Sequence, residues 1–306
     1  MASPIDNEIT HQFRLFRVHK DGHVVLFKPP VEKIPPSESD PITGVRSKDI
    51  AVSSNPTVSA RVFLPKSAEP DRKLPLLLYI HGGGFCMQSP FSPQYHNFVS
   101  TVVAAADVVA VSVDYGLFPD RPIPACYDDS WAALQWVSAH KDGDGPEAWL
   151  NDYADLSRVF VGGDSAGGNI THTLLSRVGS SGLPGIKVKG AILVHPYFAG
   201  TEDDHMWMYM CPDNKGLDDP RMRPAAEDLA RLGCDKVVVF VAEKDQLKES
   251  GKRYVEELRE SGWSGNVEMV ESVGESHCFH LFNNPKNDKA VDLVNEFVSF
   301  IKQDQI

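Results

Sequence analysis

The chain has 306 residues, of which 42% are hydrophobic and 24% are charged, and 42 acidic against 30 basic residues give it a net charge of −12. This composition is typical of a globular protein with a large core, not of a disordered or fibrous one. The acidity disfavours nucleic acid or an anionic membrane as a partner. The five cysteines are widely spaced and form no CxxC pair. We therefore expect free thiols in a reducing compartment, and neither a disulfide framework nor a zinc site.

The N-terminal part of the chain is predicted to form a separate segment. Residues 1–13 lack the apolar core of a secretory signal, and no apolar run approaches the length of a transmembrane helix. We expect a cytoplasmic protein that can also reach the nucleus by diffusion. A short strand is predicted at Val24–Phe27, followed by a stretch rich in Pro and Ser at 29–41. We expect residues 1–45 to form a cap or lid segment, and residues 46–306 to form the core of one single domain.

The next stretches alternate between strand and helix. Val58–Leu64 alternates apolar and polar residues, which predicts a strand exposed on one face. Later runs are apolar on both faces, as in buried parallel strands: Leu76–Ile80, Val108–Val113, Val159–Val161, Ala191–Val194 and Val237–Val241. Helical stretches are predicted between and after them, at Pro93–Ala106, Tyr127–His140, Ala166–Arg177, Lys248–Ser261 and Lys286–Ile301. This order indicates the α/β class, with a mostly parallel central sheet and helices on both faces. The region around 200–224 would complete the cap over the sheet.

A serine lies between a predicted strand and a predicted helix in Gly163-Asp164-Ser165-Ala166-Gly167. The pattern G-x-S-x-G in this context indicates a sharp turn that exposes a nucleophilic serine. Side chains at the two flanking positions would collide with neighbouring backbone, which explains the glycines. The helix that follows directs its N-terminal dipole toward developing negative charge. A chance Gly-Ser-Gly loop is the alternative.

A glycine cluster, His81-Gly82-Gly83-Gly84-Phe85, follows the strand at Leu76–Ile80. Glycines leave backbone N–H groups free to point at a substrate oxygen, and donors preset for an oxyanion are worth about 3 kcal/mol each. We assign Gly83 and Gly84 as donors, with the N–H of Ala166 as the third. A nucleotide-binding loop is the alternative, but no Lys-Ser/Thr follows the glycines.

A serine nucleophile needs a base, and that base needs an acid that orients it. In chains with this serine turn, the acid comes after the serine and the histidine comes after the acid. Asp245 comes directly after the predicted strand at Val237–Val241 and is our choice of acid, with Glu243 as the fallback. His277 lies before the last predicted helix and is our choice of base, whereas His280 is read as a packed residue at a helix start. No metal or cofactor is required for this chemistry.

Together these motifs resemble the plant carboxylesterase family, in the hormone-sensitive-lipase-like branch of the α/β-hydrolase fold. The resemblance covers nearly the whole chain. It includes Phe16 to Gly22, Ser59 to Pro65, Leu78 to Phe85, Val111 to Tyr115, Gly163 to Ile170, Val241 to Asp245 and His277 to Leu281. It implies a carboxylesterase that acts on a small-molecule ester through Ser165, His277 and Asp245, with Gly83, Gly84 and Ala166 as the oxyanion hole.

The same family includes 2-hydroxyisoflavanone dehydratases, related alkaloid-forming lyases and non-catalytic gibberellin receptors. The resemblance implies that the receptors lack the histidine present here as His277. It also implies that the dehydratases typically carry threonine where this chain has Ser165. Both features favour an esterase. A lyase is the alternative hypothesis, and a non-catalytic binding protein is the third. The natural substrate, its acyl chain length and the oligomeric state stay open.

Two departures from the family pattern bear on the pocket. Gly116 stands where relatives carry an arginine, so we expect a lost charge-assisted contact in that loop. The segment 199–205 is shorter than in relatives, which would open the acyl pocket. Apolar candidates for lining that pocket are Phe85, Met87, Phe118, Tyr197, Trp207, Met208 and Phe279, although ordinary core packing would explain each of them equally well. His195, after a strand, is a further candidate.

Overall fold

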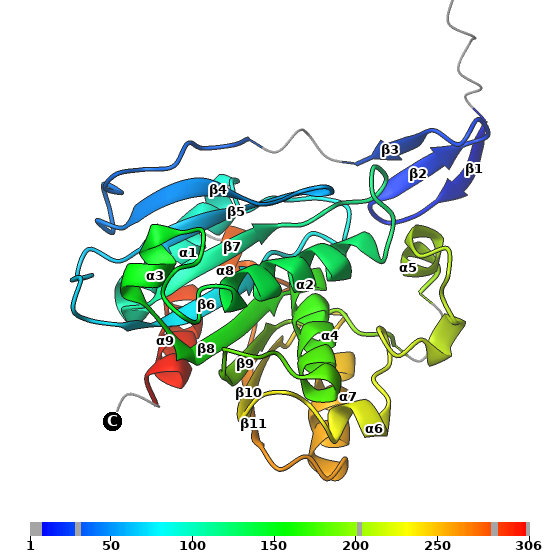
Figure 1. The fold of residues 1–306 in the computed structure, drawn as a ribbon. Coiled ribbons are helices and arrows are strands. Elements are labelled where there is room, and N and C mark those ends of the chain that lie inside the picture. The colour runs from blue at the N-terminus through cyan, green and yellow to red at the C-terminus, as the bar shows by residue number, and fades with distance from the viewer. Residues whose placement is uncertain (1–7, 28–31, 201–203, 283–286, 304–306) are drawn as a thin grey trace, which may run out of the picture.

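A computed structural model describes residues 8–27, 32–200, 204–282 and 287–303. Its centre is an eight-stranded sheet with the order β11-β10-β9-β8-β6-β7-β5-β4 (Figure 1). The strands are β4 (Arg46–Ser54), β5 (Thr57–Leu64), β6 (Leu74–Ile80), β7 (Val109–Asp114), β8 (Ala154–Asp164), β9 (Val188–Val194), β10 (Lys236–Ala242) and β11 (Asn266–Ser272). Pairing is parallel from β7 through β6 and β8 to β11, while β5 runs antiparallel to both β7 and β4. The predicted mostly parallel sheet is confirmed.

Helices cover both faces of this sheet, as predicted. On one face pack α1 (Pro93–Ala106), α8 (Phe279–Phe282) and α9 (Asp288–Lys302), and on the other α2 (Ala125–Ser138), α4 (Ala166–Ser181) and α7 (Lys248–Glu260). Strand β6 shows why its run is apolar throughout, because Leu76 and Leu78 join the core under α2 and α4 while Leu77 and Tyr79 join the core under α1 and α9. The five predicted helices correspond to α1, α2, α4, α7 and α9, with ends that differ by no more than four residues.

Several short or polar elements were not predicted from the sequence. These are β1 (Ile9–Gln12), β2 (Phe16–His19), β4, β11, α3 (Ala148–Tyr153), α5 (His205–Met210), η1 (Gly216–Asp218), α6 (Ala226–Leu229) and α8. Strands β4 and β11 lie at the two edges of the sheet and are half-exposed, so they lack the apolar run that marks a buried strand. The missed helices are too short to show a 3.6-residue period.

The prediction that Val58–Leu64 is exposed on one face is wrong. Strand β5 lies between β4 and β7 and is buried on both faces. Its polar residue Arg61 is fully buried because its guanidinium is paired. It donates to both Asp49 carboxylate oxygens at 2.7 and 2.9 Å and to the Ile34 carbonyl oxygen at 2.9 Å. His96 Nδ1 lies 3.0 Å from Nη1.

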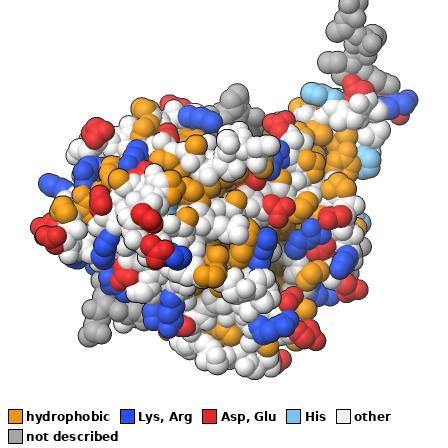
Figure 2. All heavy atoms as spheres, viewed as in Figure 1, with side chains coloured by type: hydrophobic (Ala, Val, Ile, Leu, Met, Phe, Trp, Pro, Cys, Tyr) orange, Lys and Arg blue, Asp and Glu red, His pale blue; other side chains and the backbone are white. Residues whose placement is uncertain are grey.

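The N-terminal strands form a small sheet apart from the central one. Strands β1, β2 and β3 (Val24–Leu26) make a small antiparallel sheet beside α5. The ring of Tyr209 in α5 lies 5.2 Å from Phe13, 5.9 Å from Phe16 and 6.1 Å from Phe118. Figure 2 shows hydrophobic side chains gathered where this sheet meets the body of the molecule. Residues 1–7, 28–31 and 201–203, which the predicted cap also included, lie outside the described residues.

Residues 36–45 differ from the predicted cap segment, because they run along the core. The Ser37 N–H donates to Ser47 Oγ at 2.9 Å, and the Thr43 and Ser100 hydroxyls lie 2.7 Å apart. Val45 is buried against the α1 face of the core. The stretch before β4 is therefore part of the core packing, and the prediction of a cap concerns only the small sheet and the segment after residue 203.

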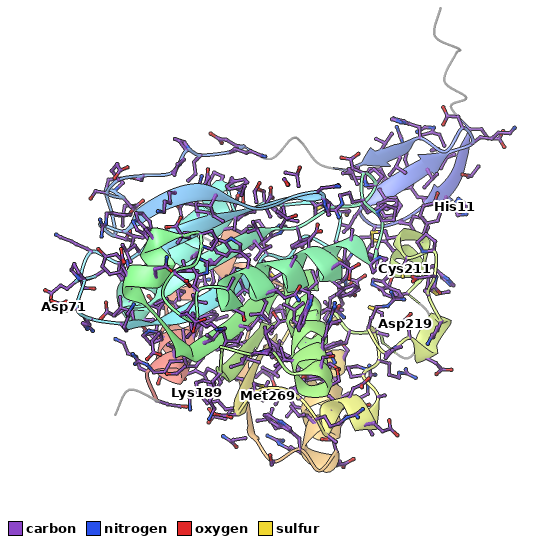
Figure 3. All side chains as sticks on the ribbon, in the orientation of Figure 1. His11, Asp71, Lys189, Cys211, Asp219 and Met269 are labelled. Atoms are coloured by element: carbon purple, nitrogen blue, oxygen red, sulfur yellow. The ribbon has the colours of Figure 1, made fainter. Side chains whose placement is uncertain are left out.

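The cap segment 204–224 is organised around Asp219, labelled with Cys211 in Figure 3. This carboxylate is fully buried and accepts hydrogen bonds from the Lys215 and Arg221 N–H groups and from the Arg221 guanidinium, at 2.7–3.1 Å. Burial alone would raise the pKa of Asp219, but the Arg221 contacts outweigh it and the pKa is lowered.

We expected the loop after β7 to lack a charge-assisted contact because residue 116 is glycine. The structure differs, because other residues brace this loop. Arg121 forms a two-point ion pair with Asp129, and the Gly116 N–H donates to the same carboxylate at 2.7 Å. A side chain at position 116 would meet this guanidinium, since its Cβ would lie 2.7 Å from Arg121 Nη1. The shortened segment 199–205 lies partly outside the described residues.

All five cysteines are free thiols, as predicted. Among the described residues, no helix is both long and apolar enough to cross a membrane.

We predict that Asp49→Ala lowers the free energy of unfolding by about 3 kcal/mol, because it leaves the buried Arg61 guanidinium without its counter-charge. Chemical denaturation followed by circular dichroism measures this. The control is Asp292→Ala, which breaks an exposed pair with Lys289 whose side chains are 65% and 52% exposed, and it should cost less than about 0.5 kcal/mol. Equal losses in both variants would contradict the role of Arg61.

Candidate active site

Ser165 lies in a sharp turn between β8 and α4, with φ 52° and ψ −117°. The turn needs the glycines that flank it, because a Cβ at Gly163 would lie 2.5 Å, and one at Gly167 2.0 Å, from the Ile80 carbonyl oxygen. Two hydrogen bonds fix it, from the Ser165 N–H to Val194 O at 2.8 Å and from the Tyr197 N–H to Ser165 O at 2.9 Å. The side chain of Ser165 therefore stands at the carboxyl edge of the sheet, at the N-terminus of α4.

The structure brings the three predicted catalytic side chains into one hydrogen-bonded chain. Ser165 Oγ lies 2.9 Å from His277 Nε2, and His277 Nδ1 lies 2.7 Å from Asp245 Oδ2. Asp245 follows β10 and His277 follows β11, so all three residues come from loops at the same edge of the sheet. The second Asp245 oxygen accepts the Leu247 N–H at 2.9 Å. Both carboxylate oxygens are therefore engaged, which orients the imidazole toward Ser165.

The carboxylate is held in its ionised form. Burial alone would raise the pKa of Asp245, but the hydrogen bond and the charge of His277, with the Leu247 N–H, lower it below its ordinary value. Glu243, the fallback acid, is exposed and accepts the Gly274 N–H at 2.6 Å instead. His280, the competing base, lies in α8, where neither ring nitrogen has a partner among the described residues and burial lowers its pKa to about 3. The geometry separates both alternatives from Ser165.

The glycine loop after β6 presents free amides next to Ser165. Gly83 and Gly84 have φ of 106° and 59°, and within the described part of the chain their N–H groups have no acceptor. The Gly82 N–H is already used, since it lies 3.0 Å from Tyr95 Oη and 3.1 Å from Asp164 Oδ1. Ala166 is the first residue of α4. The three predicted donors thus lie beside Ser165.

Asp164 forms a buried polar cluster beneath the nucleophile, which the sequence analysis did not recognise. Its carboxylate accepts the Tyr79 hydroxyl at 2.9 Å, the Tyr95 hydroxyl at 2.8 Å and the Gly82 N–H. Burial raises its pKa, although the tyrosine hydrogen bonds oppose the shift. Because Asp164 precedes Ser165 and also holds Gly82, this cluster ties the oxyanion loop to the nucleophile turn.

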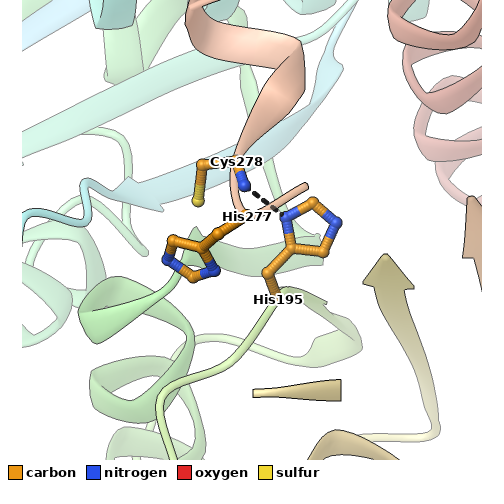
Figure 4. Close-up of side chains that lie close together, drawn as sticks. All are labelled: His195, His277 and Cys278. Carbon is orange, nitrogen blue, oxygen red and sulfur yellow. Dashed lines mark hydrogen bonds between the residues drawn. The ribbon is translucent and has the colours of Figure 1, made fainter. Parts of the chain in front are cut away.

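His195 lies behind His277, not in the pocket where it was a candidate. Its Nδ1 accepts the Cys278 N–H at 3.0 Å, as Figure 4 shows, and its ring lies 5.8 Å from that of His277. Burial, and then the neighbouring His280 and His277, hold its pKa well below the ordinary value. Because Nδ1 accepts, the proton is on Nε2, which has no partner among the described residues.

His195, His277 and Cys278 could offer ligand atoms that lie within 4.8 Å of one another. These donors are already used, however. Both His277 nitrogens bond within the triad, His195 Nδ1 accepts the Cys278 N–H, and Cys278 Sγ contacts Asp164 Oδ2 at 3.6 Å. A metal here would have to break the triad, so the cluster does not fit a resident metal site.

A cavity of about 300 Å³ contains Ser165 and His277. Its lining differs from the prediction: Met87 lines it, but Phe85, Phe118, Tyr197, Trp207 and Phe279 do not and are buried in the core, and Met208 is half-buried outside it. These aromatic side chains pack on one another, as the Phe85–Tyr197 ring distance of 5.6 Å shows. The residues that were missed are Arg14, Leu15, Gln88, Tyr95, Asp164, Cys278 and Phe282. A separate groove of about 430 Å³ between α1, α8 and α9 includes His280 but no triad residue.

We predict that Gly167→Ala lowers the free energy of unfolding by at least about 3 kcal/mol, since the new methyl group would overlap the backbone of β6. Urea denaturation of the purified variant measures this. Gly200→Ala is the control, because a Cβ there meets nothing within 4 Å. An unchanged midpoint for Gly167→Ala would contradict the tight turn.

The comparisons with known proteins agree with this geometry. The α/β hydrolase fold family matches residues 77–281. A 2-hydroxyisoflavanone dehydratase of Glycyrrhiza echinata is 40% identical over 98% of this chain and 97% of its own. The protein named probable carboxylesterase 5 of Arabidopsis thaliana is 42% identical over 97% of this chain and 99% of its own. Among solved structures, an esterase from the archaeon Pyrobaculum calidifontis is 26% identical, with a TM-score of 0.69 over 85% of this chain and 86% of that one.

The two plant relatives span nearly the full chain. The parallel sheet, the serine turn and the glycine loop of the structure are the features that the sequence motifs predicted. The chain belongs to the α/β hydrolase family, in the branch that contains the plant carboxylesterases and 2-hydroxyisoflavanone dehydratases.

Proposed function

We propose that this protein is a carboxylesterase that hydrolyses small-molecule carboxylic esters through a Ser165–His277–Asp245 triad and an acyl-enzyme intermediate. The observation that carries the proposal is the unbroken hydrogen-bonded chain from Ser165 Oγ through His277 to Asp245, with contacts of 2.9 and 2.7 Å. Full-length relatives named as carboxylesterases and a solved esterase of the same fold support the same reaction class, a carboxylic ester hydrolase.

Each step follows from the position of a group. His277 Nε2 takes the Ser165 proton while its Nδ1–H donates to Asp245, which keeps the imidazole in the useful tautomer. Ser165 Oγ attacks the ester carbonyl carbon, and the resulting oxyanion accepts hydrogen bonds from Gly83, Gly84 and Ala166. His277 then gives its proton to the leaving alcohol. Water, deprotonated by the same imidazole, attacks the acyl-enzyme and releases the carboxylic acid and Ser165.

A second candidate is an elimination, because a relative that is 40% identical is named 2-hydroxyisoflavanone dehydratase. In that reaction His277 would remove a proton from the carbon next to a ketone while the oxyanion loop polarises the ketone oxygen, and the hydroxyl group on the adjacent carbon would leave as water, taking up the proton that His277 removed. Ser165 would not need to form a covalent bond. The two functions therefore differ in their dependence on the serine hydroxyl.

We predict that Ser165→Ala lowers kcat/KM for p-nitrophenyl acetate, butyrate and octanoate at least about 1,000-fold. Loss of elimination from a 2-hydroxyisoflavanone is not expected in the same variant, if the protein has that activity. Equal turnover of all three esters by wild type and Ser165→Ala, with both proteins folded, would reject the esterase proposal.

The choice of acid has its own matched pair. Asp245→Asn should lower kcat about 1,000-fold, because an amide favours the wrong imidazole tautomer. Glu243→Gln removes the neighbouring carboxylate, which faces Gly274, and should stay within about threefold of wild type, an effect of under about 0.7 kcal/mol. The reverse pattern would assign the acid to Glu243.

We further predict that His195 is a positioning residue for His277. Removing its acceptor in His195→Leu leaves the buried Cys278 N–H unpaired, which costs about 1–3 kcal/mol, and should lower kcat about tenfold with little change in KM. His195→Asn keeps an acceptor near Nδ1 and suits the left-handed backbone at φ 48°, so it should recover most of kcat. Equal kcat in His195→Leu and His195→Asn would show that the acceptor does not matter.

A further inference from the structure

The cap contributes a positive charge to the cavity of the proposed esterase. Arg14 lies in the turn Phe13–Leu15 that joins β1 to β2, and it lines the cavity together with Ser165 and His277. The turn is held by two backbone hydrogen bonds of 2.9 Å, from Phe13 N–H to Phe16 O and from Phe27 N–H to Leu15 O.

The same turn rests on the oxyanion loop. Leu15 lies against Gly84, where an added Cβ would be 2.4 Å from Leu15 Cδ1. Phe13 packs on Phe16 and Tyr209, with ring distances of 4.9 and 5.2 Å. The backbone at Arg14 is thus fixed next to a predicted oxyanion donor, and only its side chain is free to adjust.

Arg14 has no internal counter-charge. Across the described residues its guanidinium makes no ion pair or hydrogen bond, and its side chain is exposed. The other charged group in the lining, Asp164, is buried and engaged by Tyr79, Tyr95 and Gly82. Apart from the triad imidazole, Arg14 is the one basic side chain among the described lining residues.

An acidic group, Asp204, lies beside Tyr197, whose pKa also responds to Arg14. Burial and Asp204 raise the pKa of Tyr197, and the charge of Arg14 acts against them, so Arg14 is close enough to be felt there. Asp204 is occupied, however. Its carboxylate accepts the Tyr197 hydroxyl at 2.6 Å and the Trp207 N–H at 2.9 Å. Arg14 therefore keeps its donors for a group that enters the cavity.

We propose that Arg14 binds an anionic group carried by the substrate, so that the enzyme prefers esters bearing a carboxylate over neutral esters of the same size. The guanidinium fork matches a carboxylate with two parallel N–H···O bonds. The protein as a whole has a net charge of −12. The unpaired Arg14 beside Ser165 is therefore the local feature that favours binding of an anionic group in this cavity. The proposal rests on the proposed esterase function and names its substrate class.

The test compares matched esters that differ in one carboxylate. On the acyl side, p-nitrophenyl hydrogen adipate is compared with p-nitrophenyl hexanoate, and on the alcohol side 4-carboxyphenyl acetate with phenyl acetate. The quantity measured is the ratio of kcat/KM for the anionic ester to kcat/KM for the neutral ester. Intrinsic differences in ester reactivity cancel when this ratio is compared between variants.

For at least one of the two pairs, we expect the ratio to fall about tenfold in Arg14→Gln, the factor that corresponds to one charge-assisted contact. Arg14→Lys, which keeps the charge but loses the fork, should give an intermediate ratio. The wild-type ratio should also fall with added salt, because the group is exposed. Lys20→Gln is the control, since Lys20 is a cation of the same small sheet that pairs with Glu8 at 2.7 Å.

A ratio that is the same in Arg14→Gln and wild type for both pairs, or an equal fall in Lys20→Gln, would overturn the proposal. Calorimetric binding of 4-hydroxybenzoate, a carboxylate product of one probe, gives a reading that does not need turnover. About tenfold weaker binding to Arg14→Gln supports the anion site even if no ester is hydrolysed. Hydrolysis of neutral esters without any effect of Arg14 would leave the esterase standing and reject the anion site.

Discussion

The sharp turn at Ser165 is the constraint on which the rest of the site depends. Its backbone can adopt φ 52° and ψ −117° only because Gly163 and Gly167 lie against the Ile80 carbonyl without side chains. This contact ties β8 and α4 to the end of β6, where the glycine loop begins. One local geometry thus sets both the position of Ser165, the proposed nucleophile, and the start of the glycine loop. Preorganised donors of this kind supply much of the stabilisation of an oxyanion.

Buried polar groups support the loops that contain Ser165 and His277. Asp164 links the nucleophile turn to Gly82 and to two tyrosine hydroxyls, while His195 holds the backbone just after His277. Such groups are costly to bury without partners, so they fix one arrangement of the loops when they are paired. Ser165 and His277 are therefore supported by hydrogen bonds from residues at the ends of β6, β8 and β9.

The sequence predicted the elements that short-range patterns encode. The apolar runs gave the central strands, and Ser165, Asp245 and His277 follow such strands or precede a helix, so their shared edge could be inferred. The pocket could not be inferred, because Phe85 and Tyr197 carry the same apolar signal whether they line a cavity or pack in the core. Arg14 gave no signal at all, since only tertiary folding brings the β1–β2 turn onto the glycine loop. The bracing of the Gly116 loop by Arg121 and Asp129 was not predicted either, because only the fold brings these side chains to the Gly116 N–H.

The proposed mechanism depends on Ser165 being a nucleophile that His277 activates. Covalent labelling tests this most directly. The protein is incubated with a fluorophosphonate, which reacts with activated serines, and is digested for mass spectrometry. We predict one adduct per chain, on Ser165, with the rate of labelling lost in His277→Gln. Labelling of another residue, or equally fast labelling of Ser165 without His277, would contradict the mechanism.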